Sequence, residues 1–237
     1  MEKDKTTEIQ NIYDKFHKKF YSQEFMAIRD VLKRISLREK NNLKHLHDLG
    51  KFVIFYSLPT VSPKVVVIGD NPSWFHKSNP DVAEKNLDDV AEKIPTINSY
   101  KDHGHKFGNQ LIDIFNAIGR EHWIDELVGL NRFWIQTGGG GTSELKGECK
   151  NNGKLAVYEN IKNLCEKYTK DLVKLLNPKL VILLGKKAQN IYKPIINNSF
   201  YSPKRRSFIC AIHPARGKWK QTANEIYTFL DDNEINY

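Results

Sequence analysis

The chain has 237 residues, of which 40% are hydrophobic and 11% aromatic, and its formal net charge is +9 at pH 7. We expect a folded protein with one hydrophobic core and no membrane contact, because no segment approaches the roughly 20 apolar residues that span a bilayer. Three scattered cysteines and a charged N-terminus predict a cytoplasmic or nucleoid-associated protein without disulfides. The positive charge permits binding to a polyanion such as nucleic acid.

The first 58 residues are predicted to form a helical extension. Apolar residues recur at helical spacing as far as Ile35. Ser36 and Glu39 then have the spacing of a capping box, which predicts the start of a further helix. The apolar segment Lys51–Ser57 fits either a strand or a helix end, and a proline at position 59 marks the boundary. These helices would either pack over the sheet or bind a protein partner.

From residue 59 onward, strands and helices are predicted to alternate. Strands are expected at 65–68, 130–136, 180–184 and 207–212, and helices at 80–93, 110–118, 158–176, 186–192 and 219–230. Gly119 is expected to end the second of these helices. This order predicts an α/β fold, a three-layer α/β/α sandwich with a central, mainly parallel sheet of about four strands. The predicted domains are the helical extension 1–58 and the α/β domain 59–237.

Polar or glycine-rich segments follow each predicted strand. These segments are Gly69-Asp70-Asn71, Gly138–Gly141, Gly185 and His213-Pro214. In parallel sheets the carboxyl ends of the strands meet in one crevice, so we expect a single site there.

Two other motifs are set aside. The glycine run 138–141 lacks the Lys-Ser/Thr ending of a phosphate-binding P-loop, so a flexible loop is the favoured interpretation. Asp102, His103 and His105 are close in sequence but have no cysteine near them, and no metal site is predicted.

Two short motifs carry a resemblance to a known family. Gly69-Asp70-Asn71-Pro72 and His213-Pro214-Ala215 resemble the first and second motifs of the uracil-DNA glycosylase superfamily. The chain between them is similar in layout to the iron–sulfur branch of that superfamily, through the segments 108–119, 131–135 and 165–188. That branch binds its cluster with four cysteines, whereas only Cys165 stands at a matching position here, so no cofactor is expected.

The resemblance implies a DNA glycosylase of base excision repair. Such an enzyme flips uracil or another damaged base out of the DNA and hydrolyses its N-glycosidic bond, leaving an abasic site. Asp70 or Asn71 would position the attacking water, and both assignments stay open. His213, preferably as neutral imidazole, would donate to the carbonyl oxygen of the base, and Asn131 would read the base edge.

The same resemblance implies contacts to the flipped base and to DNA. Phe107 is expected to stack on the base, with His105 and Phe75 as alternatives, and Gly69 would line the base pocket. The residues expected to contact DNA are Ser73, Arg216, Lys218, Trp219 and Lys220, with a second basic cluster at 204–206.

Two other functions remain open. In the second function, the chain is a catalytically inactive member of the same fold that binds nucleic acid or a protein. A third function, processing of free nucleosides in the same crevice, would need no DNA.

Overall fold

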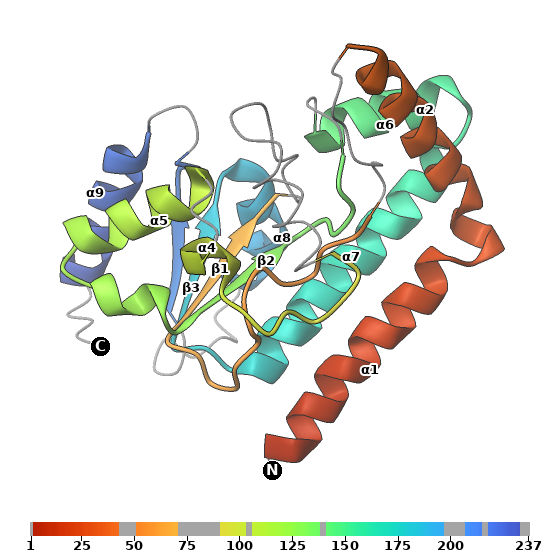
Figure 1. The fold of residues 1–237 in the computed structure, drawn as a ribbon. Helices are drawn as coiled ribbons and strands as arrows, with labels where there is room; N and C mark the ends of the chain where they lie inside the picture. Colours follow the sequence, from red (N-terminus) through yellow and green to blue (C-terminus); the bar gives the residue numbers. More distant parts are fainter. Residues whose placement is uncertain are drawn as a thin grey trace. The chain divides into compact units, whose positions relative to one another are not determined.

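The structure is a computed structural model, and it describes residues 2–42, 51–70, 91–102, 106–137, 141–196, 207–214 and 218–232 (Figure 1). The chain divides into two compact units rather than the single core expected from its length. Unit 1 comprises Met1–Ile54, Asn71–Ile94 and Asn131–Leu172, and unit 2 comprises Phe55–Asp70, Pro95–Leu130 and Val173–Tyr237. This is a different division from the predicted domains 1–58 and 59–237, which stay a prediction.

The central sheet has four parallel strands, as the sequence predicted, and their order is β2-β1-β3-β4. Their bounds are β1 Val65–Gly69, β2 Leu127–Asn131, β3 Leu180–Leu184 and β4 Ser207–Ala211. Val65 pairs with Leu180 at the start of β1 and β3, and Leu180 pairs in turn with Ser207 of β4. All residues of β1, β2 and β3 are buried, which fits the continuous apolar runs of a sheet that is covered on both faces.

Helices cover both faces of this sheet within unit 2. Their bounds are α4 Ser99–Asp102, α5 Lys106–Ala117, α8 Lys186–Ile196 and α9 Trp219–Asp232, with a 3₁₀ turn η2 at Glu121–Ile124. Helices α5 and α9 pack together on one face and α8 lies on the other, which gives the three layers of an α/β/α sandwich (Figure 1). Gly119 ends α5 with a φ of 67°, so the predicted C-cap is confirmed.

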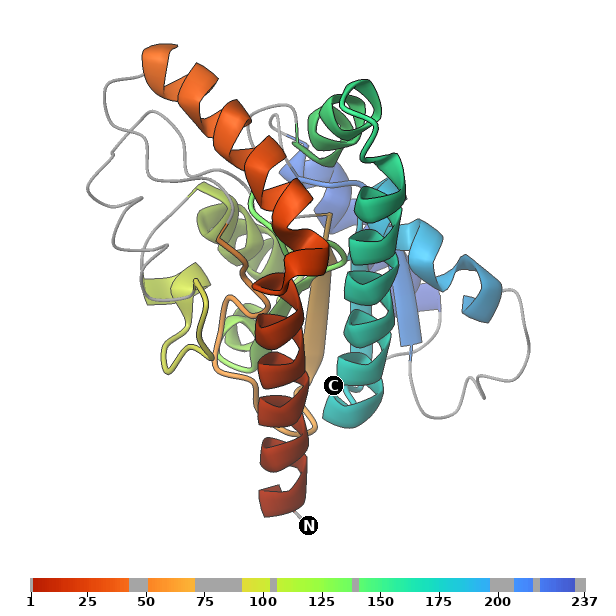
Figure 2. The same ribbon diagram turned by 90° about the vertical axis from the view of Figure 1, so that its right-hand side faces the viewer.

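Unit 1 contains the N-terminal helices. The bounds are α1 Glu2–Phe20, the 3₁₀ turn η1 Gln23–Phe25, α2 Met26–Asn42, α6 Gly141–Asn151 and α7 Leu155–Leu176, whose last four residues belong to unit 2. Helix α1 runs beside α7 (Figure 2), and α2 packs against α6.

An aromatic cluster forms the core of unit 1. Phe16 of α1 is fully buried, with its ring centroid 4.7 Å from that of Trp134 and 5.1 Å from that of Phe52. Trp134 stacks on Tyr168 of α7 at 5.9 Å. The N-terminal helix therefore contributes to a hydrophobic core and is an integral part of unit 1.

Two sequence predictions about local structure were wrong. Ser36 does not begin a helix, because α2 continues through it as far as Asn42. The second strand ends at Asn131 instead of running from 130 to 136, and residues 132–134 lie outside any strand. Gly129 interrupts the apolar pattern of the real strand, whereas the apolar residues that follow Arg132 belong to the core of unit 1.

Helix α6 was not predicted at all. It begins at Gly141, whose φ is 64°, directly after the glycine run. Only Thr142, Leu145 and Cys149 of this helix are buried, so its apolar face is narrow and gives a weak periodic signal. The three preceding glycines lie outside the described residues.

Gly129 of β2 is required by the packing of Tyr100. A Cβ at this position would clash with the buried Tyr100 ring, whose exposed fraction is 3%. We predict that Gly129→Ala lowers the free energy of unfolding by about 1–3 kcal/mol, the usual cost of overpacking a core. Urea denaturation followed by circular dichroism measures this change in the free energy of unfolding.

The matched control is Gly147→Ala in α6. No atom lies within 4 Å of a Cβ built there, so alanine is expected to stabilise the helix by up to about 1 kcal/mol. Equal stabilities of the two variants would contradict the packing of Tyr100.

Candidate functional site

The site lies at the carboxyl ends of three neighbouring strands of unit 2. Asp70 follows β1 directly, Gly185 follows β3, and His213 comes two residues after β4. The connection after β1 leads to β2 on one side of it, whereas β3 leads to β4 on the other side. The strand order therefore reverses its direction between β1 and β3, and in open α/β sheets ligands bind at such a switch point.

Asp70 is held by an ion pair. Its Oδ2 atom lies 3.0 Å from Nζ of Lys187, which stands in the first turn of α8. The side chain of Asp70 is 24% exposed and that of Lys187 is 44% exposed. Lys187 carries no signal in the sequence, because a pair between residues so far apart along the chain leaves no local pattern.

His213 is half-buried between Phe107 and Gly185. Its imidazole stacks on the ring of Phe107 with centroids 5.3 Å apart and an interplanar angle of 27°. Gly185 has a φ of +83°, and a Cβ on it would lie 3.3 Å from Cβ of His213. One face of Phe107 is thus occupied by His213, and the predicted stacking of Phe107 on a base stays a prediction.

The electrostatic environment favours neutral His213. Burial lowers the pKa of His213 below its ordinary value of 6.5, because the imidazolium loses hydration there. The negative charge of Asp70 acts in the opposite direction and raises this pKa, but the effect of burial is larger. The two side chains, far apart in the sequence, are therefore close enough to interact.

The turn that carries His213 is fixed by hydrogen bonds from α9 and from the end of β3. The backbone N–H of Ile212 donates to Oε2 of Glu225 at 2.6 Å, and Oγ1 of Thr222 donates to the carbonyl of Ile212 at 2.9 Å. The N–H of Gly185 donates to the carbonyl of Ala211 at 2.9 Å. These contacts hold the backbone on the N-terminal side of His213 in one position.

A row of aromatic rings supports Phe107 from the interior of unit 2. Tyr100 meets Phe107 edge to face at 5.6 Å, and Tyr56 stacks on Tyr100 at 5.4 Å. A Cβ on Gly108 would clash with the backbone carbonyl of Tyr100, so this glycine allows the close approach of α4 and α5. The row gives Phe107, and through it His213, a rigid support.

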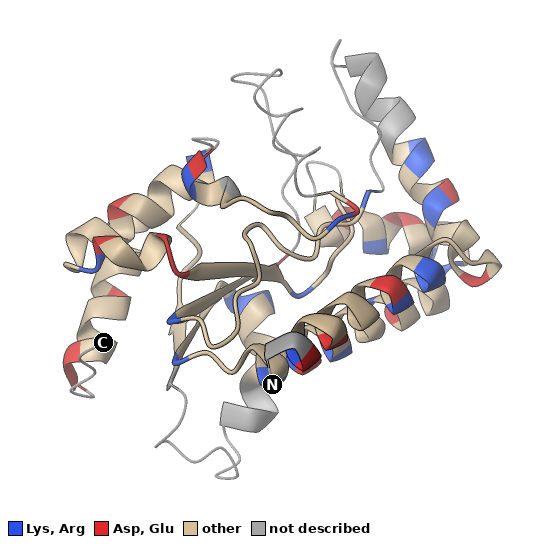
Figure 3. Cartoon of the chain, turned by 60° about the horizontal axis from the view of Figure 1, so that its bottom comes forward, with Lys and Arg blue, Asp and Glu red and all other residues tan. Residues whose placement is uncertain are grey.

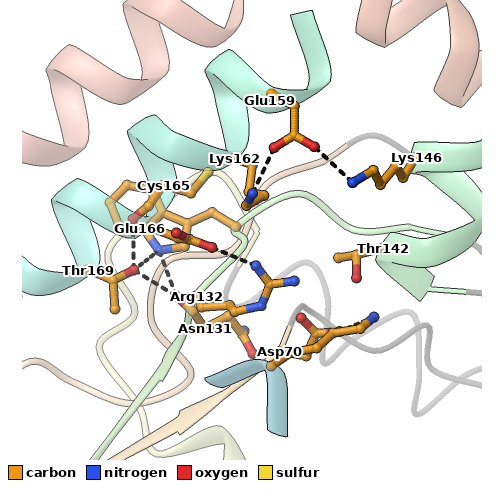
Figure 4. A network of polar contacts seen from close by, with 12 residues as sticks. Asp70, Asn131, Arg132, Thr142, Lys146, Glu159, Lys162, Cys165, Glu166 and Thr169 are labelled. Atoms are coloured by element: carbon orange, nitrogen blue, oxygen red, sulfur yellow. Dashed lines mark hydrogen bonds and ion pairs between the residues drawn. The ribbon is translucent and has the colours of Figure 1, made fainter. Parts of the chain in front are cut away.

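Asn131 is the last residue of β2 and belongs to unit 1. Its exposed fraction is 4%, and its Nδ2 atom has no hydrogen-bond partner among the described residues. Its backbone carbonyl accepts hydrogen bonds from Nε1 of Trp134 and from Oγ1 of Thr169, both at 2.9 Å (Figure 4). The backbone of Asn131 is thus fixed by hydrogen bonds within unit 1.

Polar contacts of unit 1 continue beyond Asn131. Nη1 of Arg132 lies 2.7 Å from Oε1 of Glu166, and the Arg132 side chain is 7% exposed (Figure 4). A buried arginine has to be paired, so this contact fixes the segment after Asn131 onto α7. The sequence analysis missed Arg132 because it stands within an apolar run and resembles a chance surface residue.

Among the predicted DNA-contacting residues, only Lys218, Trp219 and Lys220 lie in the described part of the chain. Lys218 and Lys220 are exposed at the start of α9, and Nζ of Lys220 lies 5.6 Å from the centroid of the Trp219 ring. Several other residues with a predicted role in the site or in DNA contact lie outside the described ranges, namely Asn71, Ser73, Phe75, His105, Arg216 and the cluster 204–206. Along α1 and α7 both signs of charge are mixed (Figure 3), so neither helix is a basic stripe.

Cys165 has the properties of a core residue. It is fully buried in α7, and burial raises the pKa of its thiol to about 12, so the sulfur stays protonated at neutral pH. Within the described ranges, no group of three His, Cys, Asp or Glu side chains is arranged to hold a metal ion. None of the helices described is both long and apolar enough to cross a bilayer.

The lowered pKa of His213 predicts a pH dependence of stability. The unfolded chain takes up a proton at this histidine near pH 6.5, whereas the folded protein does so only at lower pH. Between these two values the unfolded state binds more protons, so acidification through this window lowers the free energy of unfolding. In His213→Gln this contribution is absent, and urea denaturation across pH 5–8 should show a shallower decline. Parallel curves for the two proteins would contradict the burial of the imidazole.

No family model matches the chain and no curated protein is significantly similar to it, so the resemblance to the uracil-DNA glycosylase superfamily stays a prediction that rests on its motifs.

Proposed function

We propose that this protein is a DNA glycosylase that hydrolyses the N-glycosidic bond of uracil or another damaged base. The observation that carries the proposal is the convergence of Asp70 and His213 at the switch point of the sheet, close enough for the charge of Asp70 to act on His213. A carboxylate beside a neutral imidazole suits a reaction in which a water attacks a sugar carbon while negative charge builds on the departing base.

The reaction proceeds by displacement at the anomeric carbon. The water oxygen forms a bond to C1′ as the bond from C1′ to the base nitrogen breaks, and the electron pair of that bond leaves with the base. The proton of the water passes to the Asp70 carboxylate, or it passes to solvent if the neighbouring Asn71 positions the water, and both assignments stay open. His213 donates its N–H to the carbonyl oxygen on which the negative charge gathers. The base anion then takes a proton from solvent.

Neutral His213 serves this role well. Burial keeps its pKa low, so the imidazole carries one N–H donor and no charge at neutral pH. Its stacking on Phe107 holds the plane of the ring against that side chain. A donor held in advance costs no reorganisation when charge develops on the base.

The unpartnered amide of Asn131 supports base recognition. Its Nδ2 atom is buried and has no hydrogen-bond partner among the described residues, and a donor left in this state costs about 1–3 kcal/mol, which a base that accepts from it would recover. The carboxamide offers a donor and an acceptor, which match the edge of a pyrimidine base. In the proposal Lys218 and Lys220, both exposed at the start of α9, contact DNA phosphates.

The first test is base release from oligonucleotides. Purified protein is incubated with single-stranded and double-stranded DNA that contains uracil, hypoxanthine or xanthine, and alkali-labile sites are counted. Asp70→Ala and Asn71→Ala are assayed separately, and the variant that removes the water-positioning group should lose about 100- to 10,000-fold in rate. Asp125→Ala is the control, because Asp125 is an exposed carboxylate of unit 2 that pairs with Lys101.

Two results would reject the activity. Intact DNA with all three bases in both strand forms excludes the proposed reaction. Salt-sensitive DNA binding that survives Asp70→Ala and His213→Ala, without any cleavage, would select the nucleic-acid binding module instead.

Asn131→Leu separates recognition from stability. Leucine removes the unpartnered donor without much change in volume, so the free energy of unfolding should stay the same or rise by about 1 kcal/mol. Release of the base should fall by about 100-fold, as expected for the loss of a hydrogen bond to developing charge. A large loss of stability would show that the amide is satisfied within the folded protein.

A further inference from the structure

The turn between β3 and α8 stands between the two side chains of the proposed site. In the sheet β3 lies between β1, which leads to Asp70, and β4, which leads to His213. The turn itself consists of Gly185 and the first residues of α8. It touches both neighbours, because Gly185 lies against His213 and Lys187 reaches Asp70. None of the assignments made from the sequence gives Lys187 a role.

We propose that Lys187 is a positioning residue, whose ammonium group holds the Asp70 carboxylate in the orientation that the hydrolytic water requires. The inference rests on the proposed function and deepens it. A carboxylate on a short side chain can rotate about two bonds, and its two oxygens are equivalent until one of them is held. The contact of 3.0 Å between Nζ of Lys187 and Oδ2 of Asp70 distinguishes the two oxygens. In the proposal it thereby orients Oδ1 toward the hydrolytic water.

The geometry explains why the cation comes from this turn. Gly185 adopts a φ of +83°, which L-residues with side chains rarely reach, and thereby turns the chain from β3 into α8 within one residue. The N–H of Gln189 then donates to the carbonyl of Gly185 at 3.1 Å, and this bond closes the first helical turn around Lys187. The backbone under the cation is therefore rigid, although its side chain is 44% exposed.

Lys187 has a second effect through its charge. The carboxylate of Asp70 raises the pKa of His213, which opposes the neutral form that the donor role requires. A cation beside that carboxylate offsets part of its field at the imidazole. Lys187 thus reconciles an ionised Asp70 with a neutral His213.

An ordinary surface ion pair is the alternative, since such pairs contribute only about 0–1 kcal/mol to stability. The chain offers a matched control in Lys64, whose Nζ lies 2.7 Å from Oε1 of Glu126. Lys64 directly precedes β1 and Glu126 directly precedes β2, so this pair lies at the amino ends of the strands, whereas the proposed site lies at their carboxyl ends. Lys64→Met removes the same charge from the same unit and leaves the site intact.

The experiment compares Lys187→Met, Lys187→Arg and Lys64→Met in single-turnover release of the base. Lys187→Met should lower the rate of the chemical step by about 10- to 100-fold, because a small displacement of a reacting group has an effect of this size. Lys187→Arg keeps the cation and should recover part of the rate. Lys64→Met should match the wild type in that step, with any change confined to substrate binding and its salt dependence.

A second readout does not depend on activity. The pKa of His213 is measured by NMR titration of its ring protons, assigned from the spectrum of His213→Gln. Lys187→Met should raise this pKa, because it removes a positive charge that lies beside the Asp70 carboxylate. Asp70→Asn should lower it, and Lys64→Met should leave it unchanged.

The outcomes separate the inference from the function on which it rests. An inactive wild-type protein rejects the proposed function. An active wild type with equal chemical rates in Lys187→Met and Lys64→Met rejects the positioning role alone. A His213 titration that is the same in these two variants also rejects it, since the ion pair would then not form in solution.

Discussion

The parallel pairing of β1 with β3 is the constraint on which the rest of the site depends. Both strands are wholly buried, so each backbone N–H and C=O has to find its partner in the neighbouring strand. The register from Val65–Leu180 to Ile68–Leu183 leaves no freedom in where the two strands end. Asp70 therefore emerges beside the turn that carries Gly185 and Lys187. The pairing of β3 with β4 places the segment of His213 on the other side of that turn.

Small residues decide where the large ones of this site can lie. Gly108 and Gly129 leave the space that Tyr100 fills, and the edge of Tyr100 supports the ring of Phe107. Gly185 gives the close approach that His213 needs. Protein interiors are packed as densely as crystals, so a methyl group added at one of these glycines would push its neighbour aside. That shift would in turn disturb the support of the His213 imidazole.

The elements that the sequence predicted well are those whose signal is local. Strand β3 was predicted with its exact bounds, since an uninterrupted apolar run admits few alternatives. The predicted bounds of strand β2 lay too far toward the C-terminus. Gly129 weakens the strand pattern there, and it is required by the packing of Tyr100, a residue distant in sequence. Asp70 and His213 stood out by following apolar runs, whereas Lys187 and the stacking of Phe107 on His213 depend on contacts between distant segments. No periodicity or motif encodes such contacts.

The two side chains of the proposed site make opposing electrostatic demands. A carboxylate that positions or deprotonates water is needed in its ionised form, but its charge favours protonation of any imidazole nearby. Burial of His213 outweighs this effect. In the proposal, the Lys187 cation beside Asp70 opposes it as well. A cation 3.0 Å from Asp70 would add to the effect of burial, and for this reason a partly exposed lysine can matter to the chemistry of a partly buried histidine.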